Sequence, residues 1–129
     1  MIIDTSVWVD FSRGADVPHV DALVRALSDG TAMTTDAVRF EVLAGSREPS
    51  ADQVVAALDG CVDVLQERRT DVEAAAEIYR LCRRSGETIR SLNDCLIAAI
   101  AIRSDVPVLH DDRDFEAIAR HSELQATRG

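Results

Sequence analysis

Acidic residues stand at four points of this sequence where a carboxylate is unusual. Asp4 directly follows the apolar residues that open the chain, and Asp112 follows the apolar segment Val106–Leu109 after two polar residues. Glu41 and Asp94 lie in stretches of helical character whose neighbouring positions are apolar or small. Because an unpaired buried charge is costly, each of these carboxylates needs a partner or a bound cation.

A shared metal site would explain all four acids at once. Carboxylates that lie close together repel one another and raise each other's pKa, and a divalent cation removes that repulsion. Mg²⁺ and Mn²⁺ prefer oxygen ligands, and such ions activate water and stabilise a phosphoryl leaving group. If Asp4, Glu41, Asp94 and Asp112 converge, the chemistry they indicate is metal-dependent phosphodiester hydrolysis.

Each acid also has a purely structural interpretation. Asp4 can cap the helix that follows it, and Glu41 can reach the edge of its helix or pair with an arginine. Ser91 and Asp94 have the spacing of a capping box before eight consecutive apolar residues. Asp112 can lie in a solvated turn that caps a last helix. Spacing alone does not decide between these interpretations and convergence.

The elements that must position the acids alternate short apolar strands with helical stretches. This alternation predicts an α/β fold with a mostly parallel sheet, whose strands end at a common ligand crevice. Strands are expected at 1–4, 31–34, 61–65, 106–109 and 124–126. Helices are expected at 6–11, 18–27, from 35 or 36 to 45, and at 50–58, 71–84, 91–103 and 112–120.

The composition indicates a single soluble domain spanning residues 1–129, with 47% hydrophobic and 29% charged residues. No apolar run approaches the ~20 residues needed to cross a membrane, and the N-terminus does not resemble a signal peptide. The net charge is −9 and all 14 basic residues are arginine. An acidic protein binds nucleic acid poorly, so action on nucleic acid would require cations that reverse the local field.

The cysteines and the missing lysine exclude several classes of protein. Cys61, Cys82 and Cys95 lie among apolar neighbours without a CxxC pair, so we expect buried free thiols in a reducing cytosol. Haloacid dehalogenases, phosphate-receiver domains and P-loop NTPases all require a lysine. Haloacid dehalogenases also require a second aspartate where this chain has Ser6.

Four fragments of the sequence together resemble the PIN-domain ribonucleases, most closely the VapC-type toxins of bacterial VapBC toxin–antitoxin pairs. The fragments are Met-Ile-Ile-Asp-Thr-Ser-Val-Trp at 1–8, Glu-Val-Leu-Ala-Gly at 41–45, Asn-Asp-Cys-Leu-Ile-Ala-Ala at 93–99 and Asp-Arg-Asp-Phe at 112–115. Their order and separation extend the resemblance over nearly the whole chain. It implies a three-layer α/β/α sandwich around a short, mostly parallel central sheet.

The resemblance also implies a function and a set of site residues. The implied activity is Mg²⁺- or Mn²⁺-dependent endonucleolytic cleavage of RNA by a cytoplasmic toxin. The implied partners are a second copy of the chain in a homodimer and a cognate VapB-type antitoxin that covers the active site. The implied residues are a catalytic, metal-binding quartet with one further acid near the metals and a polar residue beside the first acid: Asp4, Glu41, Asp94 and Asp112, then Asp114, then Ser6.

His110 departs from the family pattern, which commonly has a threonine or serine at this position. The imidazole can replace that hydroxyl or ligate a metal itself, and either role would favour Mn²⁺ slightly. It can also only form a hydrogen bond near the strand end. His19 and His121 are expected to be exposed. Several arginines can contact RNA phosphates: Arg39, Arg47, Arg83, Arg84 and Arg90. The alternative function is a catalytically inactive PIN-like binding module.

Overall fold

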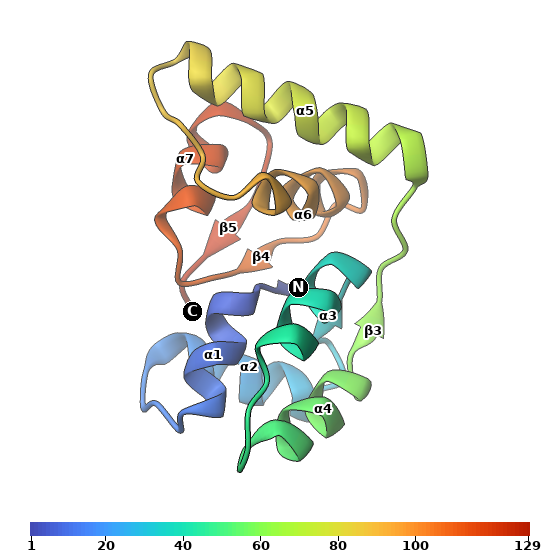
Figure 1. The fold of residues 1–129 in the computed structure, drawn as a ribbon, viewed down its shortest axis with the longest axis vertical. Coiled ribbons are helices and arrows are strands. Elements are labelled where there is room, and N and C mark those ends of the chain that lie inside the picture. Colours follow the sequence, from blue (N-terminus) through green and yellow to red (C-terminus); the bar gives the residue numbers. More distant parts are fainter.

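The computed structural model describes residues 1–129 and contains one five-stranded sheet between two layers of helices (Figure 1). All neighbouring strands are parallel, in the order β3-β2-β1-β4-β5. The strands are β1 Ile2–Ile3, β2 Met33–Thr34, β3 Val62–Asp63, β4 Val108–Leu109 and β5 Ala126–Thr127. The predicted α/β class with a parallel sheet is therefore confirmed.

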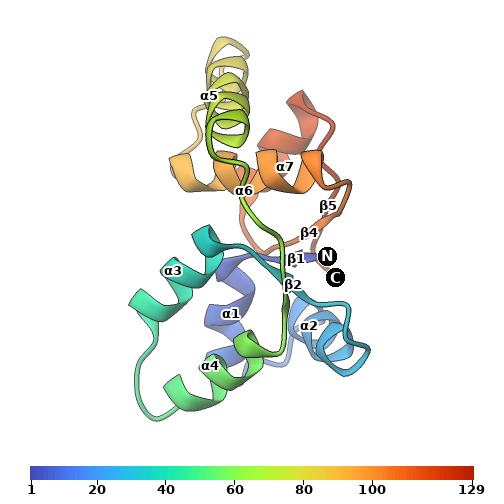
Figure 2. The same cartoon turned by 90° about the vertical axis from the view of Figure 1, so that its right-hand side faces the viewer.

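Seven helices connect the strands and cover the sheet. They are α1 Thr5–Ser12, α2 Pro18–Ser28, α3 Asp36–Gly45, α4 Ala51–Asp59, α5 Arg68–Arg84, α6 Leu92–Arg103 and α7 Arg113–His121. Helices α1 to α4 lie on one side of the sheet and α5 to α7 on the other, as Figures 1 and 2 show. This arrangement is the expected α/β/α sandwich. None of the helices has the length and apolar character needed to cross a lipid bilayer.

The centre of the molecule is built from β1, β4 and helix α6. The side chains of Ile2 and Ile3 and of Val108 and Leu109 are fully buried, as expected for strands that are covered on both faces. Helix α6 is apolar on all sides and packs between the sheet and α5, which confirms its predicted central position. The site residues therefore follow or belong to the fully buried centre of the fold.

The observed elements differ from the predicted ones mainly at their ends. Each strand has only two residues in the parallel ladder, because the next residues already turn toward a helix, as Asp4 does in capping α1. Helix α5 begins at Arg68 rather than at Asp71. The Asp71 carboxylate accepts a hydrogen bond from the Glu67 amide at 2.6 Å, so this residue stabilises the first turn from within instead of beginning the helix.

The cysteines agree with their prediction only in part. All three are free, and Cys82 and Cys95 are buried, whereas Cys61 is partly exposed. Burial raises the pKa of the Cys95 thiol to about 12 and that of Cys61 to about 11. Both thiols are therefore protonated at neutral pH and act as small core side chains.

Candidate metal centre

The two central strands bring residues from opposite ends of the chain to one edge of the sheet. Ile3 in β1 is in register with Leu109 in β4, and the Asp4 amide donates to the Leu109 carbonyl at 2.9 Å. Residues Asp4 and Asp112 follow these neighbouring strands, at the carboxyl ends where parallel sheets bind ligands.

Three carboxylates meet beside this edge. One oxygen each of Asp94, Asp112 and Asp114 lies within 4.8 Å of the other two. Asp94 comes from the first turn of α6, Asp112 caps α7, and Asp114 lies in the first turn of α7. Two helix N-termini therefore point their positive dipole ends at the same group of acids. We call these three residues the acidic centre.

Asp94 has the most strongly perturbed carboxyl group of the acidic centre. Its side chain is only 6% exposed. Burial, followed by the negative charges of Asp4, Asp112, Asp114 and Glu41, raises the pKa of Asp94 to about 8. The predicted capping-box interpretation is wrong, because the Ser91 side chain makes no cap hydrogen bond to α6. The carboxylate of Asp94 is therefore available to a cation.

Asp4 is both a helix cap and a neighbour of the acidic centre. It is 4% exposed, and its Oδ2 accepts hydrogen bonds from the Ser6 amide at 2.9 Å and the Ser6 hydroxyl at 2.5 Å. Burial raises its pKa, and the charge of Asp112 adds to that effect. The Ser6 hydroxyl also accepts from the Asp111 amide at 2.9 Å, so Ser6 ties Asp4 to the loop after β4.

Glu41 lies beside the acidic centre rather than within the group of three. Its Oε1 accepts a hydrogen bond from the side-chain amide of Asn93, the residue that precedes Asp94. The predicted pairing of Glu41 with an arginine is wrong, because its side chain bonds to Asn93 instead, whereas its partial burial leaves open that it reaches the helix edge. Burial raises its pKa, as does the charge of Asp4. Asn93 was not among the predicted site residues, although it stands inside the fragment 93–99.

His110 is buried and forms a hydrogen bond with the loop that carries Asp112. Its ring is 1% exposed, and its Nδ1 accepts a hydrogen bond from the Asp112 amide at 3.1 Å. Burial lowers the pKa of the imidazole, which is therefore neutral at pH 7. The ring also lies 5.4 Å from that of Phe115, centroid to centroid. Of the three predicted roles, these contacts match the hydrogen bond near the strand end.

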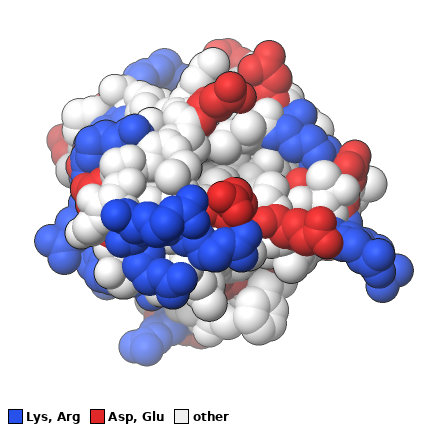
Figure 3. Space-filling view, turned by 90° about the horizontal axis from the view of Figure 1, so that it is seen from above, with Lys and Arg blue, Asp and Glu red and all other residues white.

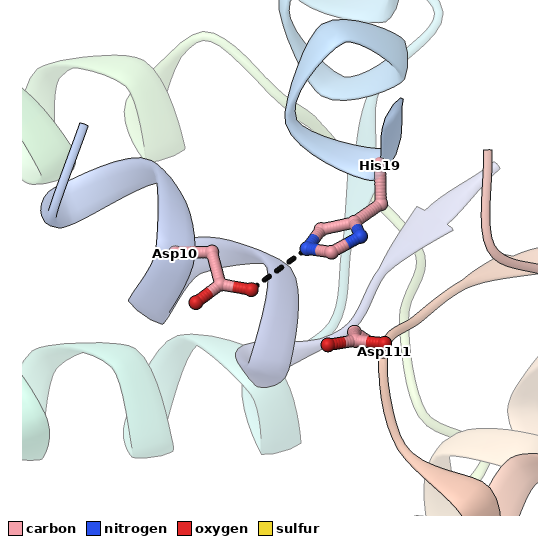
Figure 4. A group of neighbouring side chains, drawn as sticks. All are labelled: Asp10, His19 and Asp111. Atoms are coloured by element: carbon pink, nitrogen blue, oxygen red, sulfur yellow. Dashed lines mark hydrogen bonds and ion pairs between the residues drawn. The ribbon is translucent and has the colours of Figure 1, made fainter. Parts of the chain in front are cut away.

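A second group of possible ligands lies outside the predicted site. His19 is 7% exposed, so the prediction of an exposed imidazole is wrong. Its Nε2 lies 2.7 Å from the Asp10 carboxylate, which faces it from α1, with Asp111 nearby (Figure 4). Burial is possible because Asp10 satisfies the ring nitrogen. Asp111 is itself paired with Arg128. Both carboxylates of this second group therefore already have a partner within the protein.

Basic side chains are also distributed unevenly. Figure 3 looks onto the α5 end of the molecule and shows arginines gathered there beside acidic side chains. Helix α5 alone carries five arginines, of which Arg80 and Arg84 pair with Glu77. Among the predicted site acids, only Asp112 and Asp114 pair with a basic residue, and both pair with Arg90.

The fold and the site together define a class of protein. It is a parallel α/β sandwich with buried, mutually repelling carboxylates at the carboxyl edge of its sheet, a donor set suited to a hard divalent cation.

Comparison with known proteins agrees with that class. The model of the PIN domain family matches residues 1–121. VapC ribonuclease Mb1587 of Mycobacterium bovis and ribonuclease VapC11 of Mycobacterium tuberculosis are each 39% identical to this chain over 129 residues, covering 98% of the chain and 96% of the relative. The solved structure of the toxin–antitoxin system VapBC-5 from Mycobacterium tuberculosis has the same fold, with a TM-score of 0.68, 24% identity and coverage of 99% of this chain and 97% of the other. The chain belongs to the PIN-domain family and, within it, to the VapC ribonucleases.

Proposed function

We propose that this chain is a divalent-metal-dependent endoribonuclease that acts as the toxin of a toxin–antitoxin pair. The observation that carries the proposal is the acidic centre, in which three carboxylate oxygens lie within 4.8 Å of one another without enough positive charge to balance them. The names of the relatives, which are ribonucleases, agree with this chemistry.

The residues fit a hard cation such as Mg²⁺ or Mn²⁺. The donors are all carboxylate oxygens, which is the ligand type that these ions prefer. The Oδ2 atom of Asp112 and the carboxylate of Asp94 receive no hydrogen bond from the protein, so both are free to ligate. Asp94 and Asp112 would hold the ion, with Asp4 and Glu41 at its border.

A bound divalent cation would supply Lewis acidity, which neutralises charge on a phosphate and lowers the pKa of water. Hydrogen bonds within the chain orient the carboxylates that would surround this cation. Ser6 orients the Asp4 carboxylate, Asn93 orients Glu41, and the helix caps fix Asp112. Asp94 holds a proton near neutral pH, because its pKa is about 8, and that proton must leave when a cation is bound.

Cleavage of RNA in the presence and absence of metal tests the proposed activity. Metal-free protein is mixed with RNA and either Mn²⁺ or EDTA, and the products are resolved on a gel. We expect cleavage with Mn²⁺, none in EDTA, and a loss of at least about 100-fold in Asp112→Asn. The matched control is Asp59→Asn, which makes the same change on an exposed surface.

Cleavage that persists in EDTA would refute the metal requirement. Metal binding without any cleavage would indicate an inactive PIN-like module instead.

The proposed partners are a cognate antitoxin and a second copy of the chain. The structural neighbour that belongs to the VapBC family of toxin–antitoxin systems supports the first. Two apolar side chains near Glu41 are largely exposed in the single chain, Phe40 at 74% and Leu92 at 66%. Their exposure supports a partner that covers this surface. We expect light scattering to give the mass of a dimer, and we place the protein in the cytoplasm, where its RNA substrate and reduced thiols would both be found.

A further inference from the structure

Arg90 lies against the acidic centre of its own chain. Its Nη2 donates to Asp112 Oδ1 at 2.7 Å, and its Nε lies 3.3 Å from Asp114 Oδ1. Its backbone amide donates to Asp114 Oδ2 at 3.0 Å. One residue therefore holds two carboxylates of the centre through three separate donors, across 22 and 24 positions of sequence.

Arg90 binds both carboxylate oxygens of Asp114 but only one of Asp112. Both oxygens of Asp114 accept from Arg90, and the side chain is only 7% exposed, so this carboxylate is already engaged within the protein. The Oδ1 atom of Asp112 accepts hydrogen bonds from the Arg90 guanidinium and from the Asp114 amide. Its Oδ2 atom accepts none. Asp114, predicted as a further metal ligand, is thus placed to anchor Arg90, whereas Asp112 can bind Arg90 and a cation at the same time.

Arg90 is also the only basic residue that pairs with any of the predicted site acids. A guanidinium stays protonated at every pH of interest, so this positive charge is permanent. The hydrogen bond to Asp114, followed by the charges of Asp112 and Asp114, raises the pKa of Arg90 further. The chain therefore carries one built-in counter-ion for its acidic centre, bound to Asp112 through Oδ1.

The outer part of this guanidinium faces solvent. The Arg90 side chain is 56% exposed, and its Nη1 makes no hydrogen bond or ion pair. It borders a hollow of about 460 Å³ whose charged lining residues are three arginines and three acids: Arg90, Arg113 and Arg120, and Glu87, Asp114 and Glu116. A planar guanidinium that is held on one edge and open on the other suits a phosphate, which it can bind through paired N–H donors.

We propose that Arg90, anchored by Asp114, is a positioning residue of the acidic centre that restrains Asp112 and presents its free edge to a phosphate of the RNA backbone. The phosphate contact rests on the proposed ribonuclease function, whereas the counter-ion role does not. Arg90 has two opposite effects on ligands. It lowers the affinity of the centre for a divalent cation and raises the affinity for RNA.

Mn²⁺ titration and RNA cleavage of an Arg90→Gln variant test both effects. We expect calorimetry to show Mn²⁺ bound about three- to tenfold more tightly than by the wild type, because a nearby positive charge is gone. We expect kcat/KM for RNA to fall about tenfold or more, mainly through KM. The matched control is Arg25→Gln, which removes the same charge from an exposed position of α2 on the other side of the sheet, and should change neither value more than about twofold.

The two ligands make the outcomes distinguishable. Weaker or unchanged Mn²⁺ binding in a folded Arg90→Gln variant would overturn the counter-ion role, and unchanged RNA cleavage would overturn the phosphate contact. Should Arg90→Gln fail to fold, Arg90→Lys decides, because it keeps the charge but loses the paired donors: Mn²⁺ affinity should stay near the wild-type value while cleavage falls. A wild type that binds Mn²⁺ but cleaves no RNA would refute the proposed function, and the Mn²⁺ titration would still decide the role of Arg90.

Discussion

Two groups of possible ligands in this protein look alike by distance and differ in charge. In each group, Asp94–Asp112–Asp114 and Asp10–His19–Asp111, the ligand atoms lie within 4.8 Å of one another. In the second group both carboxylates have a partner, since His19 Nε2 lies 2.7 Å from Asp10 and Asp111 pairs with Arg128. In the first, Asp94 has no partner and its pKa is raised to about 8. Uncompensated charge, rather than proximity, therefore separates a candidate metal centre from a structural contact.

The largest expected difference between the two groups is in catalysis. Asp94→Asn should reduce Mn²⁺-dependent RNA cleavage at least about 100-fold, because it removes a ligand from the acidic centre. Asp10→Asn makes the same chemical change in the other group and should leave cleavage within about threefold of the wild type. Initial rates on one RNA substrate measure both. Equal losses in the two variants would show that the groups are not functionally distinct.

Mn²⁺ should stabilise the fold through the acidic centre alone. A ligand that binds only the native state at a hundredfold excess over its Kd adds about 2.7 kcal/mol, or roughly 10 °C in Tm for a chain of this size. We expect such a shift in the wild type and in Asp10→Asn, and little or none in Asp94→Asn. Thermal unfolding with and without Mn²⁺ provides the measurement, and a full shift in Asp94→Asn would place the ion elsewhere.

The second group should matter for stability instead. Asp10→Ala leaves the buried His19 ring without its partner and should cost about 1–2 kcal/mol of unfolding free energy. The expected Kd for Mn²⁺ is unchanged. Chemical denaturation and calorimetry on the same preparation separate the two effects. A weakened Kd would mean that the Asp10–His19 contact contributes to the metal centre.

A separate expected effect concerns pH and needs no metal. Because the pKa of Asp94 is raised above its unfolded value, the native state keeps this proton up to about pH 8 while the unfolded chain has already lost it. In metal-free protein, the contribution of Asp94 to the stability of the fold therefore falls as the pH rises from about 5 to 8. At ~1.4 kcal/mol per pH unit, the wild type should lose about 10–15 °C of Tm relative to Asp94→Asn over this range. His110 and the N-terminal amine titrate in both proteins and cancel in the comparison, so parallel Tm curves would contradict the raised pKa.

The comparison also shows what the sequence could and could not predict. The parallel sheet, the central helix α6 and the group Asp94 and Asp112 follow from apolar runs and from the acids that border them, because those patterns are local. The burial of His19 does not, since it depends on a partner nine residues earlier on another helix. The anchoring of Arg90 by Asp114 was missed for the same reason. Sequence patterns indicate which residues are unusual, whereas only the folded chain shows how their charges are balanced.

Calorimetric titration of metal-free protein with Mn²⁺ tests the central claim most directly. The comparison needs three proteins: the wild type, Asp94→Asn and Asp10→Asn. Binding that is lost in Asp94→Asn and retained with the wild-type Kd in Asp10→Asn is the expected result. Equal binding by all three proteins, or no heat from the wild type at millimolar Mn²⁺, would contradict a metal centre at Asp94.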